Sequence, residues 1–430
     1  MCNIKLIIVF CFVIEIVSTE NVKAFHADSF VESLGVNVHW AYDNVYTVNY
    51  TELRTKLSQL GIRYVRDRTH PQIYLRANDL YKSFGIQTLL ITGRYKPGPS
   101  QRVLDPSQVE QELNEIKTQA FVATVGIEGP NEYNIQHTPE PNWILNLRNY
   151  TNCLYRTAKA DEMLTNLPLI GPSLTSLESY KEVGNLDEYI DYANVHMYFG
   201  DGWPGFPGWD VNGTRSIHWY LDDLARRQSP SGKRVQATET GYHNFMPHNG
   251  ISEEAEGKYI VRSFMEFFRR GVYRTYKYEL VDENKLDQQG HYGLLRANLT
   301  EKHSFKAIKN LIDIFNDKGS QFETNSLNYT LDGTTNDTRQ ILFQKRNGDF
   351  YLVVWLEVES WNTTTHTDIY PSLQHLSMIF ENNQRISKGI LYALDNYANI
   401  NIQNLTITNN RINFNATDKI SVMKLISNKF

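Results

Sequence analysis

Between residues 33 and 316 the sequence alternates short apolar runs with longer amphipathic stretches. The short runs are apolar or β-branched, and the stretches between them repeat their apolar residues with helical periodicity. This alternation predicts βαβ units, in which parallel strands form one sheet and the helices cover it. We expect eight strands: Leu34–Trp40, Ile62–Arg66, Thr88–Thr92, Ala123–Glu128, Pro168–Pro172, Ala193–Tyr198, Arg234–Glu239 and Thr275–Leu280.

The number of units distinguishes a closed barrel from an open sheet. Eight strand-and-helix units in this span fit a (β/α)8 TIM barrel, and no Gly-rich phosphate loop follows the first strand, as an open dinucleotide-binding sheet would need. We therefore assign residues 25–318 to an α/β barrel. Its expected helices include Glu52–Leu60, Gln108–Gln119, Pro141–Ala160, Ser216–Arg227, Ser252–Arg270 and Phe305–Phe315.

After Asp317 the pattern changes to strands and turns without helical stretches. Asn347-Gly348 has the composition of a two-residue hairpin turn. Residues 319–430 are thus expected to form a small all-β domain, a sandwich appended to the barrel. Its expected strands are Gln340–Lys345, Phe350–Glu357, Met378–Phe380, Gly389–Leu394, Asn404–Thr408 and Ile420–Ile426.

The N-terminus has the layout of a secretory signal peptide, which we assign to residues 1–24. Lys5 precedes an apolar run from Leu6 to Val17, and small or polar residues follow. The run is shorter than the roughly 20 apolar residues that span a membrane, although a signal anchor is the alternative interpretation. The mature chain is expected to be secreted to the extracellular space, without a membrane span.

Cysteines and glycosylation sequons also bear on secretion. Cleavage of the signal peptide would remove two of the three cysteines and leave only Cys153, so no intramolecular disulfide is expected. Each sequon that is used must lie on the surface. Nine Asn-X-Ser/Thr sequons predict a glycoprotein, at Asn49, Asn149, Asn212, Asn298, Asn328, Asn336, Asn362, Asn404 and Asn415.

Charge argues against a nucleic-acid partner. The 43 Lys and Arg against 48 Asp and Glu give a net charge of −5, and no long basic run is present. A protein that neutralises a phosphate backbone needs such a run.

Two expected strands end on carboxylates, where a barrel places its reactive side chains. The fourth strand runs into Glu128-Gly129-Pro130-Asn131-Glu132, and the seventh ends at Thr238-Glu239-Thr240-Gly241. Two carboxylates facing each other across a barrel mouth suit glycoside hydrolysis, in which one protonates the leaving oxygen and the other attacks the anomeric carbon.

The Glu128-x-x-Asn131-Glu132 and Thr238-Glu239-x-Gly241 patterns together resemble the clan A glycoside hydrolases. The resemblance implies that Glu132 is the acid/base and Glu239 the nucleophile of a retaining mechanism. It also implies that Asn131 donates a hydrogen bond to the substrate 2-hydroxyl.

Other segments support the resemblance. Val195-His196-Met197-Tyr198 looks like the clan's His-x-Tyr, which implies that Tyr198 orients the nucleophile. We assign His196 to the sugar site, and a hydrogen-bonded interior histidine is the alternative. Arg66 ends a second strand like that of the clan, and the resemblance implies that it binds substrate. Two departures concern the substrate: Tyr133 follows the acid/base where many relatives have Pro, and strand eight has Tyr278 in place of an obvious Trp. We expect Tyr278 to bind the sugar.

Several further residues allow two interpretations. His39 and Trp40 end the first strand, and because side chains alternate along a strand only one of them faces the site; we assign Trp40 to substrate binding. Glu128 lies deeper and is expected to be a structural partner. The loop from Gly200 to Asp210 is either an aromatic wall for sugars or a self-packed lid.

No metal site is expected, because the spacing of His243 and His248 matches no zinc pattern. Burial should raise the pKa of Glu132, so that it starts the cycle protonated, whereas Tyr198 and Arg66 should keep Glu239 ionised.

The sequence therefore predicts a secreted retaining glycosidase that cleaves O-glycosidic bonds of β-linked sugars and needs no cofactor, with α-linked sugars as the alternative. Its partner would be an oligo- or polysaccharide or a glycoconjugate. The alternatives are a carbohydrate-binding barrel that has lost turnover and a transglycosidase with the same residues.

Overall fold

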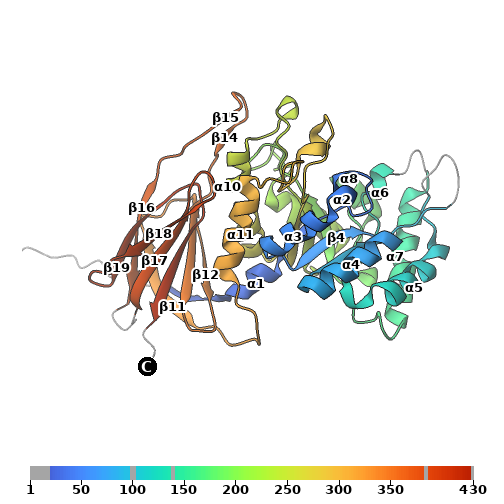
Figure 1. Ribbon diagram of the computed structural model, residues 1–430, viewed down its shortest axis with the longest axis horizontal. Helices are drawn as coiled ribbons and strands as arrows, with labels where there is room; N and C mark the ends of the chain where they lie inside the picture. The colour runs from blue at the N-terminus through green and yellow to red at the C-terminus, as the bar shows by residue number, and fades with distance from the viewer. Residues whose placement is uncertain (1–19, 97–102, 137–140, 382–385, 428–430) are drawn as a thin grey trace, which may run out of the picture.

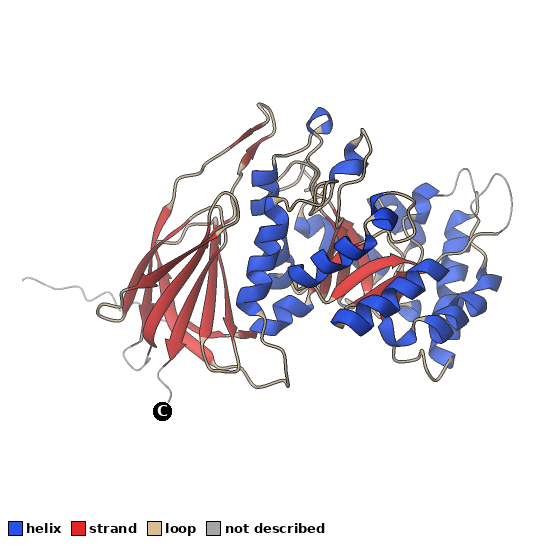
Figure 2. Cartoon of the chain, viewed as in Figure 1, coloured by secondary structure: helices blue, strands red, loops and turns tan. Residues whose placement is uncertain are grey.

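The computed structural model describes residues 20–96, 103–136, 141–381 and 386–427. These residues form two units: a barrel of parallel strands surrounded by helices, and a strand-only sandwich packed against one side of it (Figures 1 and 2). The predicted fold class, a TIM barrel followed by a β-sandwich, is confirmed.

The barrel consists of one eight-stranded sheet in the order β7-β6-β5-β4-β3-β10-β9-β8, with all neighbours parallel. A parallel bridge between Ile170 and Tyr192 joins the two ends of this order. The strands are β3 (Leu34–Asn37), β4 (Tyr64–Arg68), β5 (Gln87–Ile91), β6 (Thr124–Glu128), β7 (Leu169–Ile170), β8 (Ala193–Met197), β9 (Val235–Thr240) and β10 (Arg274–Lys277).

Helices cover the outside of this sheet (Figure 2). They are α1 (Ala27–Glu32), α2 (Val45–Val48), α3 (Tyr50–Leu60), α4 (Pro71–Phe84), α5 (Val109–Gln119), α6 (Tyr133–Gln136), α7 (Trp143–Ala160), α8 (Leu177–Val183), α9 (Arg226–Gln228), α10 (Glu253–Arg269) and α11 (His303–Phe315). Within the predicted helix Ser216–Arg227, residues Trp219–Ala225 are π-helical (η4) and lead into α9. Short 3-10 turns complete the connections: η1 (Pro106–Gln108), η2 (Phe121–Ala123), η3 (Asp187–Tyr189), η5 (Met246–His248) and η6 (Gln288–His291).

The barrel has two apolar layers. Aliphatic residues between the strands and the helices form the main core, and a small cluster that includes Tyr64, Leu89 and Tyr276 fills the interior. The Tyr276 ring lies directly against Gly35 of β3, where any Cβ would overlap it. Glycine at residue 35 therefore gives the interior ring its space.

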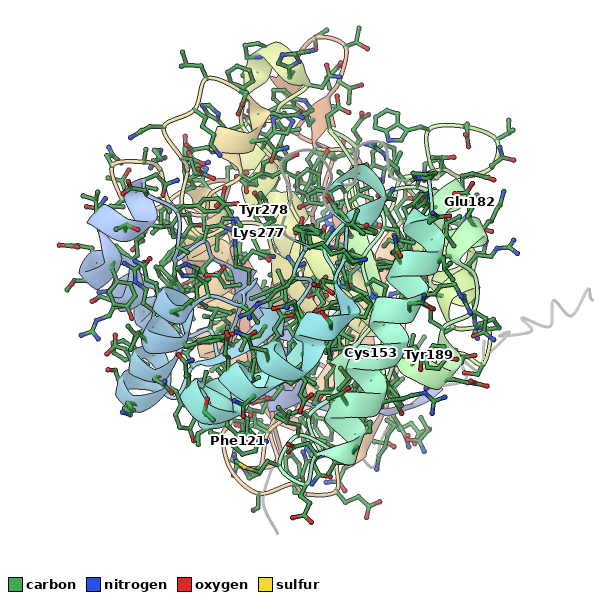
Figure 3. The ribbon with its side chains drawn as sticks, turned by 90° about the vertical axis from the view of Figure 1, so that its right-hand side faces the viewer. Phe121, Cys153, Glu182, Tyr189, Lys277 and Tyr278 are labelled. Carbon is green, nitrogen blue, oxygen red and sulfur yellow. The ribbon has the colours of Figure 1, made fainter. Side chains whose placement is uncertain are left out.

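The carboxyl ends of the strands all point to one end of the barrel. In Figure 3 Tyr278, which follows β10, lies near the upper end, whereas Phe121, which precedes β6, lies at the lower end. Side chains at strand ends therefore converge at the upper end, as in other barrels of this type.

The sandwich has a four-stranded sheet, β1-β11-β16-β19, and a six-stranded sheet, β18-β17-β20-β13-β12-β2. Its strands are β1 (Glu20–Lys23), β2 (Phe25–His26), β11 (Ser326–Asp332), β12 (Thr338–Gln344), β13 (Phe350–Leu356), β16 (Gln374–Phe380), β17 (Ile386–Leu394), β18 (Ile400–Leu405), β19 (Arg411–Ala416) and β20 (Ser421–Ser427). A separate hairpin pairs β14 (Trp361–Asn362) with β15 (Thr367–Asp368).

The central strand β13 of the six-stranded sheet is buried on both faces. All seven residues of β13 are buried. Leu352 and its alternate neighbours belong to the sandwich core, whereas Val353 and Trp355 belong to the barrel core. Because successive side chains of a strand point to opposite faces, β13 contributes to both apolar cores and so connects the two domains.

The sandwich begins earlier in the chain than we predicted. β1 pairs with β11 and β2 pairs with β12, so residues 20–26 belong to this domain, whereas the sequence assigned residues up to 24 to the signal peptide. Residues 1–19 of that predicted signal lie outside the described residues. Strands β11 and β19 were not predicted, and the strand expected at Asn404–Thr408 is β18, which ends at Leu405. Among the described residues, no helix has the length and apolar character needed to cross a membrane.

The pairing of β1 with β11 yields a prediction for residues 20–24. A chain that begins at Phe25 lacks the β1 ladder and the packing of Val22 and Ala24, so it should be about 1 to 3 kcal/mol less stable than a chain that begins at Glu20. Urea unfolding of the two chains measures the difference. Equal midpoints would show that β1 does not contribute to the sandwich.

Candidate active site

A cleft of about 1090 Å³ opens at the carboxyl ends of the barrel strands. The cleft is lined by His39, Tyr42, Asn131, Glu132, Ile135, Tyr198, Gly200, Asp201, Trp209, Arg215, Glu239, Gly241, His243, His248, Asn249, Tyr278, Gln288, Gln289, Tyr292 and Thr363. A second cavity of about 460 Å³ shares His39, Tyr42, Asn131 and Glu239 with it. The two cavities are therefore neighbours on either side of Glu239.

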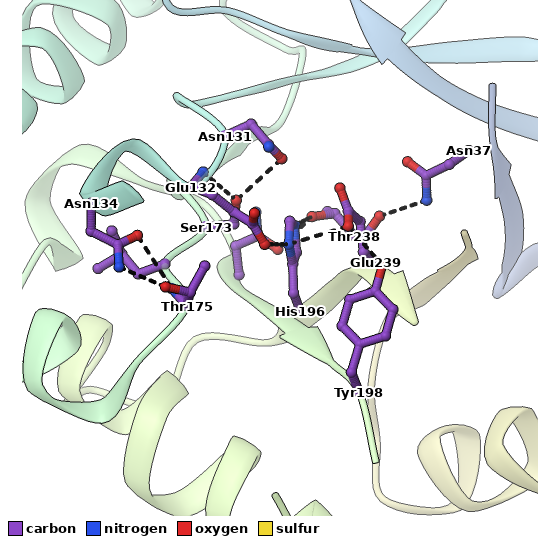
Figure 4. A network of polar contacts seen from close by, with 12 residues as sticks. Asn37, Asn131, Glu132, Asn134, Ser173, Thr175, His196, Tyr198, Thr238 and Glu239 are labelled. Atoms are coloured by element: carbon purple, nitrogen blue, oxygen red, sulfur yellow. Dashed lines mark hydrogen bonds and ion pairs between the residues drawn. The ribbon is translucent and has the colours of Figure 1, made fainter. Parts of the chain in front are cut away.

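The two predicted catalytic carboxylates lie together in this cleft (Figure 4). Glu132 follows β6 and Glu239 lies on β9. One carboxylate oxygen of each and one ring nitrogen of His196 all lie within 4.8 Å of one another. The barrel thus brings together residues that are far apart in the sequence.

The backbone fixes the direction of Glu132. Its φ of 45° is left-handed, a conformation that non-glycine residues rarely adopt. Its N–H donates to the carbonyl oxygen of Ser173 at 3.1 Å and lies 3.1 Å from the Ser173 hydroxyl. The loop after β7 therefore holds this strained residue so that its side chain points into the cleft.

Arg66 of β4 organises the floor of the site. All five of its N–H groups have acceptors. Nε and Nη2 contact Glu128 at 2.6 and 2.7 Å, and Nη2 also contacts Asn131 at 2.6 Å. Nη1 contacts both Asn37 and Glu239 at 2.8 Å. Glu128 is completely buried and does not line the cleft. Its position is thus that of the structural partner we expected, rather than of a substrate contact.

Glu239 has two partners on opposite oxygens. Arg66 contacts Oε1 at 2.8 Å, and the Tyr198 hydroxyl donates to Oε2 at 2.8 Å. Burial and the charge of Glu239 hold the pKa of Tyr198 well above its usual value, so the phenol stays a neutral donor. Both contacts fix the orientation of the Glu239 carboxylate.

The state of Glu132 differs from our prediction. Burial raises its pKa, but the hydrogen bond to His196 Nδ1, at 2.7 Å, and the charges of His196 and Arg66 outweigh burial and lower the pKa. Burial lowers the pKa of His196, yet the charge of Glu239 and the contact with Glu132 raise it overall. In the free protein the proton of this pair therefore resides on the imidazole.

Asn131 is fixed by the same arginine. Arg66 donates to its Oδ1 at 2.6 Å, and the Ser173 hydroxyl lies 3.5 Å from the same oxygen. The amide oxygen is therefore occupied, and the amide nitrogen is the atom that can donate to a ligand in the cleft.

Aromatic residues cover the side of Glu239 toward β10. Tyr278 lines the cleft as predicted from its place at the end of strand eight, and its ring packs edge-on against Tyr292. Tyr292 also packs against Tyr198 and lines the cleft. Tyr292 was not predicted as a site residue, because it lies in a loop and no strand pattern places it.

The assignment of Trp40 to the substrate site is wrong. Trp40 is 1% exposed and packs against Tyr46 and Tyr50, behind the strand, whereas His39 lines the cleft. Alternation along the strand allowed only one of the two to face the site, and the apolar indole is the one buried against α2 and α3.

A buried acid lies behind His39. His39 Nε2 is 3.5 Å from Glu279 Oε2, and the Tyr46 hydroxyl donates to the same oxygen at 2.7 Å. Burial, reinforced by the charge of Glu283, raises the pKa of Glu279 well above its usual value. Burial also lowers the pKa of His39 to about 3. His39 is therefore neutral at pH 7, which leaves it able to donate or to accept in the cleft.

The loop from Gly200 to Asp210 combines both of its predicted roles. Phe206 is buried and packs edge-on against Phe199 and Trp203. Trp209 packs on Phe206 but stays 51% exposed and lines the cleft. The loop is thus packed on itself and still presents one indole to a ligand.

Glu132, His196 and Glu239 have the spacing of a metal-ligand set. The Arg66 guanidinium lies 2.8 Å from Glu239 and supplies a fixed positive charge there, so a divalent cation would be repelled. His243 and His248 also line the cleft without joining this set.

The fold is that of known glycoside hydrolases, although no family model and no curated protein sequence matches the chain. A family 39 glycoside hydrolase from Bacteroides cellulosilyticus superposes with a TM-score of 0.64 at 13% identity, over 94% of this chain and 83% of that one. A monomeric β-xylosidase from Caulobacter crescentus gives 0.61 at 12% identity, over 95% and 98%. A family 30 endoxylanase from Clostridium papyrosolvens gives 0.56 at 11% identity, over 95% and 98%. The predicted resemblance to clan A is confirmed at the level of the fold.

The neutral state of His39 predicts acid sensitivity. Because its pKa is lower in the folded protein than in the unfolded chain, the unfolded chain binds the proton first, and stability falls as the pH falls from 6.5 toward 3. Between pH 7 and 5 this one residue should contribute about 2 kcal/mol to the loss. Between pH 7 and 5 the His39→Gln variant should therefore lose about 2 kcal/mol less unfolding free energy than the wild type. Urea unfolding at both pH values measures this difference.

The control is Val211→Ala, because Val211 is fully exposed and does not titrate. Its loss of stability between pH 7 and 5 should equal that of the wild type. An undiminished loss in His39→Gln would contradict the neutral assignment of His39.

Proposed function

We propose that this protein is a retaining glycoside hydrolase that cleaves β-linked sugars by double displacement, with Glu239 as nucleophile and Glu132 as acid/base. The observation that carries the proposal is the pair of carboxylates within 4.8 Å of each other at the mouth of the barrel. Retaining enzymes hold their two carboxyl groups about 5 to 5.5 Å apart, whereas inverting enzymes leave a wider gap for water.

The first step joins the sugar to Glu239. Its carboxylate attacks the anomeric carbon while a proton passes from Glu132 to the leaving oxygen, so that one C–O bond forms as the other breaks. Tyr198 and Arg66 hold the two oxygens of Glu239 and so orient the attack. Asn131 is the donor in place for the 2-hydroxyl next to the reacting carbon.

The Glu132–His196 pair supplies the proton. In the free protein His196 holds it, at 2.7 Å from Glu132 Oε1. A bound sugar excludes water, and burial raises the pKa of a carboxylate, so binding favours return of the proton to Glu132. Once Glu239 is glycosylated its negative charge is gone, and His196 loses the charge that raises its pKa. Glu132 then accepts a proton from the water that cleaves the intermediate.

The structural neighbours suggest the class of substrate. The structural neighbours are described as a xylosidase, an endoxylanase and a glucosidase, which makes a β-linked pentose or hexose chain the first choice. A non-catalytic binding protein would have no use for a strained Glu132 directed at Glu239. A transglycosidase uses the same residues and differs only in its acceptor.

Secretion and N-glycosylation form part of the proposal. None of the nine sequon asparagines is buried in the structure, so glycans could be attached to them without unfolding the chain. Enzymatic removal of N-glycans from the protein secreted by insect cells should reduce its mass. An unchanged mass would contradict the glycosylation assignment.

Two substitutions test the catalytic roles. With an oligosaccharide substrate, Glu239→Gln should lower kcat at least 10³-fold, because no nucleophile remains. Glu132→Gln should lower kcat/KM by 10² to 10⁴-fold on the oligosaccharide and by less than 10-fold on a glycosyl fluoride, whose leaving group needs no proton. Reducing-sugar and fluoride release measure the two rates.

Glu178→Gln, on an exposed part of α8, is the control and should leave both rates unchanged. Equal losses on both substrates in Glu132→Gln would rule out its role as the acid. Activity close to the wild type in Glu239→Gln would rule out the nucleophile.

A further inference from the structure

One segment of the sandwich domain reaches the cleft of the barrel. After β13 the chain passes from Glu357 to the β14–β15 hairpin, which extends toward the same end of the molecule as the barrel loops (Figure 1). Thr363, at the turn of this hairpin, lines the cleft. The sandwich therefore contributes directly to the wall of the proposed active site.

Glu357 anchors the start of this segment inside the molecule. Its Oε1 accepts from Arg262 of α10, which is itself completely buried, and its Oε2 accepts from Trp355 Nε1 at 2.8 Å. Oε1 also accepts from the backbone N–H of Gly205 at 3.2 Å. One buried carboxylate thus joins the sandwich, a barrel helix and the loop after β8.

The rest of the segment has its own fixed points. The Ser360 N–H donates to the Tyr259 hydroxyl at 2.8 Å, and the Ser252 hydroxyl donates to Asp368 at 2.5 Å. Trp361 is buried in the barrel core. The hairpin is therefore held at both ends by α10 and the residue that precedes it.

The contact at Gly205 is close. A Cβ at residue 205 would overlap the side chain of Glu357. Gly205 lies in the same loop as Phe206 and Trp209, and Phe206 packs on the exposed indole with ring centroids 5.1 Å apart. The position of Trp209 at the cleft therefore depends on the loop that Glu357 holds.

Trp209, Arg215 and Thr363 line the cleft together with the two carboxylates. At about 1090 Å³ the cleft exceeds the range of about 300 to 1000 Å³ typical of pockets for compact ligands. Exposed indoles are common platforms for flat rings, because they bring a large surface to the contact. The cleft thus has room and a platform beyond the sugar that reacts.

We propose that the sandwich domain completes a second sugar subsite, in which Trp209 is the binding platform and Glu357 a positioning residue acting through Gly205. This inference rests on the proposed function and deepens it. The enzyme then acts on chains of at least two sugar units, and it gains binding energy from the second unit that a single sugar cannot supply.

The test compares a substrate that fills only the reacting subsite with one that extends beyond it. β-Xylosyl fluoride and xylotetraose form one pair, and β-glucosyl fluoride and cellotetraose form a second; the pair that the wild type cleaves is used. Trp209→Ala should lower kcat/KM for the tetrasaccharide by 10 to 100-fold, mainly through KM, and change that for the fluoride by less than threefold.

Gly205→Ala tests the positioning role without removing the buried carboxylate. It should produce the same selective loss as Trp209→Ala. Glu357→Gln should also do so, but this substitution weakens a buried ion pair and can unfold the domain, so its melting temperature must be measured alongside. Val211→Ala, in the same loop and fully exposed, is the control and should leave both substrates unaffected.

The possible outcomes separate the two proposals. Equal losses on fluoride and tetrasaccharide in Trp209→Ala, or no loss on either, would overturn the second subsite while leaving the hydrolase intact. A Gly205→Ala protein with unchanged tetrasaccharide kinetics would overturn the positioning role of Glu357. A different outcome would count against the proposed function. In that outcome the wild type cleaves none of the four substrates, and the Glu132 and Glu239 variants cleave none either.

Discussion

The site depends on one buried guanidinium between two carboxylates. Arg66 is 2% exposed and uses every one of its N–H groups within the barrel. A buried charge that loses a partner is strongly destabilising, so replacing Glu128 or Glu239 is expected to lower the stability of the barrel. The fork of the guanidinium also fixes geometry, because it contacts Glu128 through two nitrogens and directs a third at Glu239. Stability and orientation of the proposed nucleophile therefore come from the same interaction.

The two nearby carboxylates have different partners. Glu239 lies against Arg66 and Tyr198, whereas Glu132 faces His196. Thr238 extends the network beneath them, since its hydroxyl donates to Asn194 at 2.8 Å and lies 3.1 Å from His196 Nε2. In the proposed mechanism the proton needed for the leaving group is stored on the imidazole until a bound sugar removes water from Glu132. The contacts of His196 with Glu132, Glu239 and Thr238 set this proton balance.

The sequence predicted the fold well because its strongest signals are local. Strand and helix alternation sets the barrel, and carboxylates at the ends of β6 and β9 must converge because all parallel strands end on one side. The assignment of Trp40 to the substrate site failed because side-chain alternation predicts that one of two neighbouring residues faces the site but does not predict which one. The lowered pKa of Glu132 was missed because it depends on a 2.7 Å contact with His196 that only the folded chain creates. Thr363 and Gly205 gave no signal at all, since their roles arise from packing between two domains.

The most direct test of the central claim is to trap the proposed intermediate. Incubation with a 2-deoxy-2-fluoroglycosyl fluoride of the sugar that the wild type cleaves should leave one glycosyl group on the protein, because the 2-fluorine slows release of the intermediate. Peptide mass spectrometry should find that group on Glu239, and the Glu239→Gln protein should stay unlabelled. A label on another residue, or inverted anomeric configuration in the first product of an unlabelled active enzyme, would contradict double displacement through Glu239.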